Sequence, residues 1–418
     1  MGTGLFASSS SILLLYYLTD TLGVAAALAG LVLFIPKFWD VVFDPLVGVA
    51  SDRLRSRWGR RQPFLVAGAL LAGLAFWATF HLPAMVGPAM RAPVAGLAFF
   101  VGMSGYALFA VPYAAMAAEL SDDTHERTRI MAWRMGGALV GTLLGAVAAP
   151  MLVASGGGAR PGHAFMGAVL AAAIVLAMGI TAWGAGALPA RAVVDAPHVA
   201  WREQLRLALS NRAYFVLLLG YVCVLVGNGA MAAAAPYFAV HVLGRSADAV
   251  GAIFGCLLVA AMAAMPLWAA LSRRLGKHAC AVASALVFAA ALAALHVVEA
   301  GSPPLLLWGL CAVAGAGFAG TQLLPFSILT DLIHADTLRS GMRREGSFTG
   351  LFIAGEKAGL ALGPLLTAGV LSLTGFVVAP EGAAVQPPAA VAGIAVAFTL
   401  VPAALAGLGA VVLLRVGR

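Results

Sequence analysis

Three charged residues stand close together in an otherwise apolar stretch: Lys37, Asp40 and Asp44. A charged side chain at membrane depth costs about 2.5–3.5 kcal/mol on insertion scales, so three in one segment need a function. On a helix that turns about 100° per residue they fall within about 60° of one another, on one face. Two carboxylates about 5–6 Å apart can bind a small cation or hold one proton between them. The alternative is a neutralised Lys–Asp pair that orders helix packing, although one lysine cannot neutralise two aspartates.

The composition indicates where this helix lies. Of the 418 residues, 62% are hydrophobic and only 10% are charged, which is typical of a polytopic membrane protein. No basic segment or cleavage site marks the first apolar stretch as a signal peptide. Stretches of about 20 apolar residues predict twelve spans, near 3–22, 25–50, 63–85, 92–119, 129–154, 163–189, 213–241, 247–271, 278–298, 304–331, 348–374 and 389–414.

The net charge of +8 follows membrane topology. Most Lys and Arg residues fall in even-numbered loops and the C-terminal tail, so both termini are predicted to be cytoplasmic. The basic balance therefore reflects topology and not a binding partner: no nucleic acid is expected, and the lipid bilayer is the partner that the apolar spans imply. The four cysteines have neither metal-ligand spacing nor a disulfide framework, and are interpreted as buried thiols.

A polar connection at 190–212 divides the chain into an N-terminal half, 1–189, and a C-terminal half, 213–418. It contains an amphipathic stretch at 201–207 that is suited to the cytoplasmic surface. After spans two and eight, each half has a small or polar residue followed by arginine, then glycine and further basic residues. The predicted fold class is an all-α membrane protein with twelve helices in two pseudo-symmetric six-helix halves, the plan of the major facilitator superfamily.

Few other polar residues lie inside the spans. Tyr106, Arg134, Asn228 and Gln322 are candidates for a substrate cavity. Lys357 has apolar sequence on both sides and needs a carboxylate partner or a deprotonated state. Spans two and eleven border the central cavity of a two-half transporter, so Lys357 is expected to meet the span-two aspartates. Such a lysine, with Lys37, would couple cation binding to conformation; the alternative is a static salt bridge.

Four blocks of sequence resemble the glycoside–pentoside–hexuronide:cation symporters of the major facilitator superfamily. They are spread over both halves, so the resemblance covers essentially the whole chain. The blocks are Leu15-Tyr16-Tyr17-Leu18-Thr19-Asp20 with Gly23; Trp39-Asp40-x-x-x-Asp44-Pro45-x-x-Gly48-x-x-x-Asp52-Arg53 with Ser56-Arg57-Trp58-Gly59-Arg60; Val111-Pro112-Tyr113 with Glu126-Arg127-Thr128-Arg129 and Arg134; and Asp331-x-x-x-x-Asp336 with Gly341-Met342-Arg343-Arg344-Glu345-Gly346 and Lys357-Ala-Gly-Leu-Ala-Leu-Gly363.

The resemblance implies roles for residues in these blocks. The aspartate pair would form a sodium or proton site with Lys357 close by, and Tyr106 and Arg134 would line a sugar cavity. Arg–carboxylate pairs in three loops would close the cytoplasmic side and break on opening, although topology determination also explains these charges. The gate residues are Asp52, Arg53, Arg57, Glu126, Arg127, Arg343, Arg344 and Glu345.

The chain departs from the family at three positions. The family's sugar-binding aspartate in span one falls at Gly4, its third cation-site carboxylate at Ala110, and its sugar-stacking tryptophan at Ala114. A proton or a two-carboxylate sodium site is therefore as plausible as the family arrangement. Hydroxyl recognition needs fixed polar groups that outweigh desolvation, so the loss of these ligands counts against a sugar as the solute. Relatives also have more sequence before span one, so further residues are expected upstream of Met1.

These observations favour a cation-coupled symporter of a small polar solute, such as a glycoside, sugar or sugar acid. A carrier of an amphiphile such as a lysophospholipid is a second interpretation, because relatives of that kind keep the aspartates and lack the sugar ligands. A non-transporting receptor on the same fold is a third. No nucleophile–base arrangement or cofactor motif is found, so an enzyme is not expected. We expect a functional monomer in the inner (cytoplasmic) membrane; the substrate, the ion and the direction of transport stay open.

Overall fold

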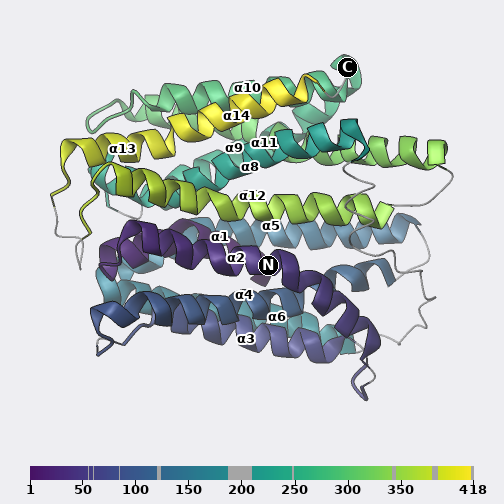
Figure 1. Ribbon diagram of the computed structural model, residues 1–418, viewed down its shortest axis with the longest axis horizontal. Helices are drawn as coiled ribbons and strands as arrows, with labels where there is room; N and C mark the ends of the chain where they lie inside the picture. Colours follow the sequence, from purple (N-terminus) through teal and green to yellow (C-terminus); the bar gives the residue numbers. More distant parts are fainter. Residues whose placement is uncertain are drawn as a thin grey trace. The chain divides into compact units, whose positions relative to one another are not determined.

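The computed structural model describes residues 1–54, 56–59, 61–83, 85–119, 124–186, 210–246, 249–340, 345–378 and 385–415. Every regular element in these ranges is a helix (Figure 1). The elements are α1 (Gly2–Tyr16), η1 (Tyr17–Thr21), α2 (Ala26–Arg53), α3 (Gln62–Phe80), α4 (Pro88–Glu119), α5 (Thr124–Ser155), α6 (Ala159–Gly186), α8 (Arg212–Tyr237), η2 (Phe238–Val242), α9 (Ala249–Leu275), α10 (Lys277–Leu295), α11 (Pro304–Ser340), α12 (Glu345–Leu373), α13 (Pro388–Phe398) and α14 (Leu400–Leu413).

The helices match the predicted spans closely. Among the described residues, eleven helices are long and apolar enough to cross a membrane, and the continuous pair α1–η1 supplies the remaining predicted span. Several helices extend past the apolar stretch that predicted them; α11, for example, continues to Ser340. Hydrophobicity marks the part of a helix that lies in lipid, whereas backbone hydrogen bonding can continue into water. The amphipathic stretch at 201–207 lies outside the described residues.

The last predicted span, 389–414, is confirmed as one candidate membrane span, Pro388–Leu413, with a local irregularity inside it. It consists of two helices, α13 and α14, separated at Thr399. The Thr399 hydroxyl donates to the Ala395 carbonyl at 2.6 Å and lies 3.0 Å from Nδ1 of His296. The backbone N–H groups of Thr399 and Ala403 keep their bonds to the Ala395 and Thr399 carbonyls, each at 3.0 Å, so the helical hydrogen bonding continues through this residue. A threonine side chain that also bonds to the preceding turn accounts for a local bend.

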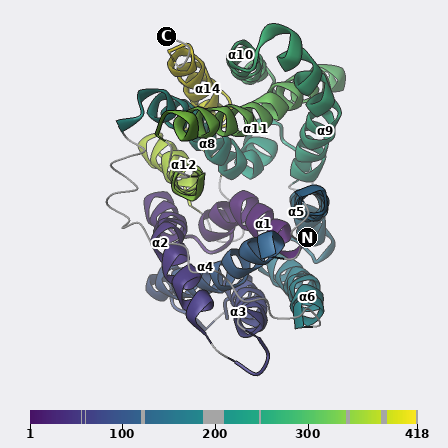
Figure 2. The ribbon, with the colours of Figure 1, turned by 90° about the vertical axis from the view of Figure 1, so that its right-hand side faces the viewer.

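The helices group into two compact units. One contains α1 to α6, and the other contains α8, α10, α11, α13, α14 and most of α9 and α12. In the first unit α3 packs between α4 and α6, while α1 packs on α5 and α2 on α4 (Figure 2). In the second unit α10 packs on α11 and α14, and α14 also packs on α8. The boundaries 1–189, 190–212 and 213–418 stay a prediction.

The two units repeat the same local structure. The first helix of each ends in a π-helical turn, η1 in one and η2 in the other, followed by Leu-Gly. Both glycines, Gly23 and Gly244, have positive φ (70° and 61°), a conformation that only glycine adopts readily. π-helical turns are rare and occur often at functional sites. Neither turn is signalled by the hydrophobic pattern.

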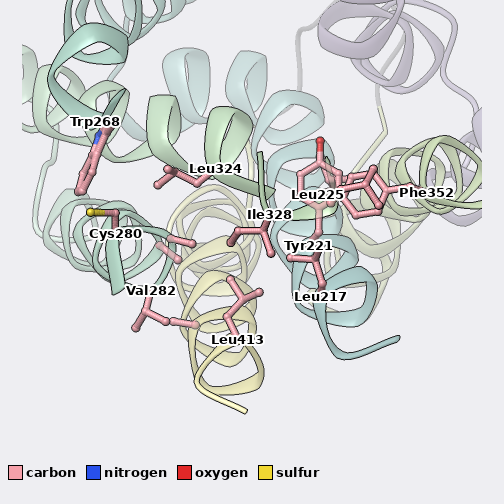
Figure 3. Packing of buried hydrophobic residues seen from close by; sticks show 14 of the residues in the cluster. Leu217, Tyr221, Leu225, Trp268, Cys280, Val282, Leu324, Ile328, Phe352 and Leu413 are labelled. Carbon is pink, nitrogen blue, oxygen red and sulfur yellow. The ribbon is translucent and has the colours of Figure 1, made fainter. Parts of the chain in front are cut away.

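The second unit has a core of buried hydrophobic side chains contributed by α8, α9, α10, α11, α12 and α14. Figure 3 shows Trp268 and Cys280 at one end of this cluster, and Tyr221 beside Phe352 at the other. The Trp268 indole Nε1 donates to the Ala316 carbonyl at 2.7 Å, so this buried polar group is satisfied. The cluster ties α8 to α11 and α12 and so holds the polar residues of those helices in place.

Candidate functional site

The span-two charges lie on α2 as predicted. Asp40 is 2% exposed, and Asp44, one helical turn later, is half-buried. Lys37 does not neutralise them: its Nζ donates to the Ser11 hydroxyl of α1 at 3.1 Å, and no ion pair of Lys37 is found in the described part of the chain. The described contact of Lys37 is thus with Ser11, and the choice between a cation site and a packing pair stays a prediction. Lys37, Asp40 and Asp44 are called the stripe below. The stripe places two carboxylates in an apolar helix, and the Lys37 ammonium bonds to α1.

Prolines on both sides of the stripe change its backbone. Pro36 and Pro45 lie inside α2, and each lacks the N–H that would bond to the carbonyl four residues earlier. Pro45 thereby leaves the Val41 carbonyl without its intrahelical donor, beside Asp40. Among the described residues, no third His, Cys, Asp or Glu joins the aspartates in a metal-binding group. Backbone carbonyls of interrupted helices coordinate Na⁺ in other transporters, so Val41 is a candidate oxygen ligand beside the two carboxylates.

Aromatic packing surrounds the same part of α2. The Trp39 ring lies 5.4 Å, centroid to centroid, from both Phe43 of α2 and Phe100 of α4. These contacts fix the helix that carries the aspartates against α4. A low-polarity surrounding strengthens the attraction between a carboxylate and a cation, and raises the cost of leaving the carboxylate charged without one.

Two predicted cavity residues lie in the first unit, on α4 and α5. The Tyr106 ring is 5.5 Å from the Phe6 ring of α1, and it is half-buried. The guanidinium of Arg134 lies over the ring of Tyr113 at 5.5 Å, a cation–π contact between α5 and α4. Arg134 is therefore held by an aromatic face that the sequence interpretation did not assign to it. Val111-Pro112-Tyr113 had been recognised only as a family motif.

Position 4 is closed by helix packing. A Cβ built on Gly4 would lie 2.6 Å from the backbone nitrogen of Thr142 and would also overlap the Ala138 carbonyl, both in α5. Real Cβ contacts are not that short, so α1 and α5 pack at a distance that only glycine allows here. The missing sugar-binding aspartate thus reflects backbone contact between two helices, and a carboxylate at this position has no room.

The remaining candidates lie in the second unit. Asn228 of α8 is buried, Gln322 of α11 is half-buried, and Lys357 of α12 is half-buried. Gly355 and Gly359 face α8, because their Cβ positions would contact Leu218 and Leu225. Lys357 is about 200° from Gly355 on the helix and so points away from α8. Its approach to the aspartates of the first unit stays a prediction.

Most predicted gate residues cannot be placed. The side chains of Asp52, Glu126, Arg127 and Glu345, and the whole of Arg343 and Arg344, lie outside the described residues. The two that can be placed are exposed. Arg53 lies in the last turn of α2, and the Arg57 guanidinium is 5.7 Å from the Trp58 ring. Their role in a gate stays a prediction.

The structure shows a related pair of contacts that the sequence interpretation missed. In the first unit, Nη1 of the buried Arg61 donates to the Pro112 carbonyl of α4 at 3.1 Å. In the second unit, Lys277 pairs with Asp331 of α11 at 2.6 Å. Each basic residue stands at the start of the third helix of its unit and binds the fourth helix near a proline, Pro112 or Pro325. The sequence signal that could have predicted these contacts is the matched pair Val111-Pro112-Tyr113 and Leu324-Pro325-Phe326, one in the fourth helix of each unit.

We expect the Lys277–Asp331 pair to add little stability. The two side chains are 35% and 59% exposed, and exposed ion pairs contribute less than about 1 kcal/mol. A double-mutant cycle of Lys277→Ala and Asp331→Ala, read by unfolding of the purified protein, should give a coupling free energy below about 1 kcal/mol. A coupling of several kcal/mol would show that the pair is shielded from solvent and holds α10 on α11.

Comparison with known proteins identifies the family. The profile described as MFS/sugar transport protein matches residues 1–416. An uncharacterised symporter of Synechocystis sp. is 27% identical, with 93% of this chain and 87% of the relative covered. The glucuronide carrier protein homolog of Escherichia coli K12 is 27% identical, with 95% and 85% covered. The inward-facing structure of a bacterial homologue of the human lysosomal transporter Spinster superposes with a TM-score of 0.72, at 15% identity, over 99% of this chain and 95% of that chain.

These findings confirm the predicted fold class and the predicted family. The helices form the multi-pass arrangement of major facilitator transporters, as the structural comparison shows. The chain is a membrane transporter and not an enzyme, since the matched family consists of transport proteins. With a family profile that covers essentially its whole length, the chain belongs to the MFS/sugar transport protein family of the major facilitator superfamily.

Proposed function

We propose that this chain is a secondary active transporter that couples a cation, sodium or proton, to the movement of a small polar solute. The observation that carries the proposal is the Asp40–Asp44 stripe, whose nearest lysine is engaged by Ser11. Buried carboxylates in a span are costly and mark ion or proton pathways. The solute we propose is a glycoside, sugar or sugar acid, in keeping with a relative named as a glucuronide carrier homolog.

Alternating access supplies the coupling in this proposal. Cation binding at Asp40 and Asp44 changes the charge that Lys37 and Lys357 experience, and so favours one conformation over another. A ligand shifts such an equilibrium only by its difference in affinity between the two states. The transporter acts as a single chain in the inner membrane with both termini in the cytoplasm, and needs no cofactor beyond the coupling ion.

A carrier of an amphiphile is the second candidate. Its supporting observation is the closed position at Gly4, together with the small side chains of Ala110 and Ala114 on α4. Without fixed polar groups, these positions favour an apolar solute surface over a hydroxylated one. A non-transporting receptor is a weaker candidate, because a receptor does not need a buried carboxylate pair.

Thermal stabilisation of the purified protein separates these candidates. A ligand that binds the folded state raises its stability by RT ln(1 + [L]/Kd), about 2.7 kcal/mol at one hundred times Kd. We expect an upward shift of the unfolding midpoint with methyl β-D-glucopyranoside or glucuronate, and a larger shift when sodium or a lower pH supplies the coupling ion. The measurement is an unfolding scan with and without sodium, choline replacing it at equal ionic strength.

Each outcome selects one candidate. Stabilisation by lysophosphatidylcholine alone would reject the sugar interpretation in favour of the amphiphile carrier. Stabilisation that depends on sodium identifies that ion, and stabilisation that depends only on pH identifies the proton. Binding without any concentrative transport in proteoliposomes would support the receptor instead.

A further inference from the structure

Glu356 is a carboxyl group inside a membrane span to which the proposed function gives no role. It lies in α12, within the apolar stretch Phe348–Leu373, and it is half-buried. An ionisable side chain at membrane depth is costly and marks an ion or proton pathway. No hydrogen bond or ion pair of Glu356 is found in the described part of the chain. Its role must therefore be sought in the groups that surround it.

The packing of α12 shows where Glu356 points. Phe352 faces α8, since its ring stacks on the Tyr221 ring at 4.8 Å with an interplanar angle of 4° (Figure 3). Gly359 faces α8 as well, and Glu356 lies within about 60° of both residues around the helix. Lys357, although next in sequence, lies about 140° from Phe352. The carboxyl group is therefore placed beside α8, whereas the neighbouring ammonium points away from it.

Tyr221 brings a second polar group to the same place. Its hydroxyl is buried and has no hydrogen-bond partner among the described residues. The carboxyl group of Glu356 is an electrostatic neighbour of this hydroxyl. Buried polar groups in folded proteins are nearly always hydrogen-bonded, and an exception points to a catalytic role or to a bound water or ion.

Three aromatic rings pack together beside these two groups. The Phe326 ring of α11 meets the Tyr221 ring at 5.9 Å and the Phe352 ring at 5.2 Å, edge-on in both cases. The titratable residues of α11 nearest to Phe326 on either side are Asp331, which is ion-paired with α10, and Cys311, about four turns away. Next to such rings, a charged carboxylate without a hydrogen-bond donor costs far more than a protonated carboxyl group.

The other two helices bring few further titratable groups to the Glu356 carboxyl. On α12 its electrostatic neighbour is Lys357. On α8, the Tyr214 hydroxyl donates to a backbone carbonyl of α12 at 2.7 Å, and Cys223 lies about 160° round the helix from Tyr221. The phenol of Tyr221 is thus the group on α8 that can exchange a hydrogen bond with this carboxyl.

We propose that Glu356 and the Tyr221 hydroxyl form a proton-binding site in the second unit. The carboxylate takes one proton from water on one side of the membrane and returns it to water on the other. The phenol donates a hydrogen bond to the ionised carboxylate and accepts one from the protonated carboxyl group, so each state of the site has a partner. The site rests on the proposed cation-coupled transport and deepens it, because it names the proton as an ion that the second unit carries.

Proton binding at this site changes the charge beside Lys357. The ionised Glu356 attracts the ammonium, and the protonated carboxyl group does not. A ligand shifts a conformational equilibrium by its difference in affinity between the two states. The proton is therefore coupled to transport because Lys357 changes its surroundings between the two conformations.

The first test detects the proton without any solute. The infrared spectrum of the purified full-length chain contains the C=O stretch of protonated carboxyl groups, and spectra at two pH values show which of them titrate. Glu356→Gln removes one carboxyl group at the same size, and Glu299→Gln makes the same change at an exposed residue. We expect a titrating band at the high frequency typical of a carboxyl group outside water, which Glu356→Gln loses and Glu299→Gln keeps.

Tyr221→Phe tests the partner. It keeps the ring that stacks on Phe352 and removes only the hydroxyl. The band should remain in this variant but move in frequency, because the carboxyl group has lost its hydrogen-bond partner. A purely structural role of the Tyr221 hydroxyl would leave the band where it is.

The second test counts protons during transport. Proteoliposomes that contain a pH-sensitive dye take up labelled methyl β-D-glucopyranoside, a probe without charge, and the dye reports the protons that enter with it. Glu356→Gln should lower the ratio by about one proton per probe molecule, because one carboxyl group binds one proton. Glu299→Gln should leave the ratio unchanged.

The outcomes separate this site from the proposed function. A wild type without the high-frequency band, or an unchanged band in Glu356→Gln, would overturn the proton site whether or not the probe is transported. A lost band with an unchanged proton ratio would overturn its part in coupling. If the wild type does not transport the probe, the proposed sugar transport fails, and the infrared spectra still decide whether Glu356 binds the proton.

Discussion

Asp40→Asn and Asp44→Asn should each abolish concentrative transport. The asparagine amide has nearly the same size as the carboxyl group but can neither carry a negative charge nor take up a proton. The accumulation ratio of a labelled solute, driven by an imposed sodium or proton gradient in proteoliposomes, should fall to about one. Every factor of ten in that ratio corresponds to about 1.4 kcal/mol of coupling.

Two comparisons make this result specific. Glu299→Gln makes the same chemical change at an exposed residue, and transport should be unaffected. The aspartate variants should still unfold in a single cooperative transition as purified proteins, so that the loss of transport reports on the carboxyl group and not on misfolding. Wild-type accumulation in both aspartate variants would refute a role for this pair in coupling.

Gly4→Ala should destabilise the first unit strongly, and Gly4→Asp should prevent accumulation of folded protein. The added Cβ would lie 2.6 Å from the Thr142 nitrogen, and backbone atoms cannot yield as a flexible side chain can. Overpacking of this kind costs about 1–3 kcal/mol, and the aspartate adds a buried charge to that cost. The midpoint of thermal unfolding and the yield of monodisperse protein measure the two effects.

Gly136 provides the matched control. It lies in α5, the same helix that contacts Gly4, but a Cβ there would meet nothing within 4 Å. Gly136→Ala should leave the midpoint unchanged or raise it slightly, since alanine is the better helix former. Equal midpoints for Gly4→Ala and Gly136→Ala would show that α1 and α5 can separate, and that position 4 could accept a larger residue.

Much of the helix arrangement could be predicted from local sequence. The apolar stretches predicted the number of spans and most of their positions, because burial in lipid requires about 20 consecutive apolar residues. The local bend at Thr399 was not predictable in this way, since α13 and α14 are equally apolar on both sides of it. It depends on a side chain that bonds to the Ala395 carbonyl.

In the candidate site, too, some features could be predicted from local sequence and others depend on contacts between helices. Helical spacing placed Asp40 and Asp44 on one face, and composition showed that the face lies in an apolar span. The partner of Lys37 could not be read from spacing, because Ser11 lies on another helix. The Arg61–Pro112 contact and the cation–π contact of Arg134 likewise join helices that are distant in sequence.

The sequence by itself determined that this chain is a multi-pass membrane protein with a carboxylate pair in its second span, because hydrophobicity and helical period are properties of short segments. The transport function was indicated by the four blocks that resemble a transporter family. Only the tertiary structure decided that Lys37 bonds to Ser11, that Gly4 is closed by α5, and that the buried amide of Asn228 has no hydrogen-bond partner among the described residues. Each of these facts depends on how closely two helices approach. That distance is set by side-chain volumes on both helices together, and no single segment specifies it.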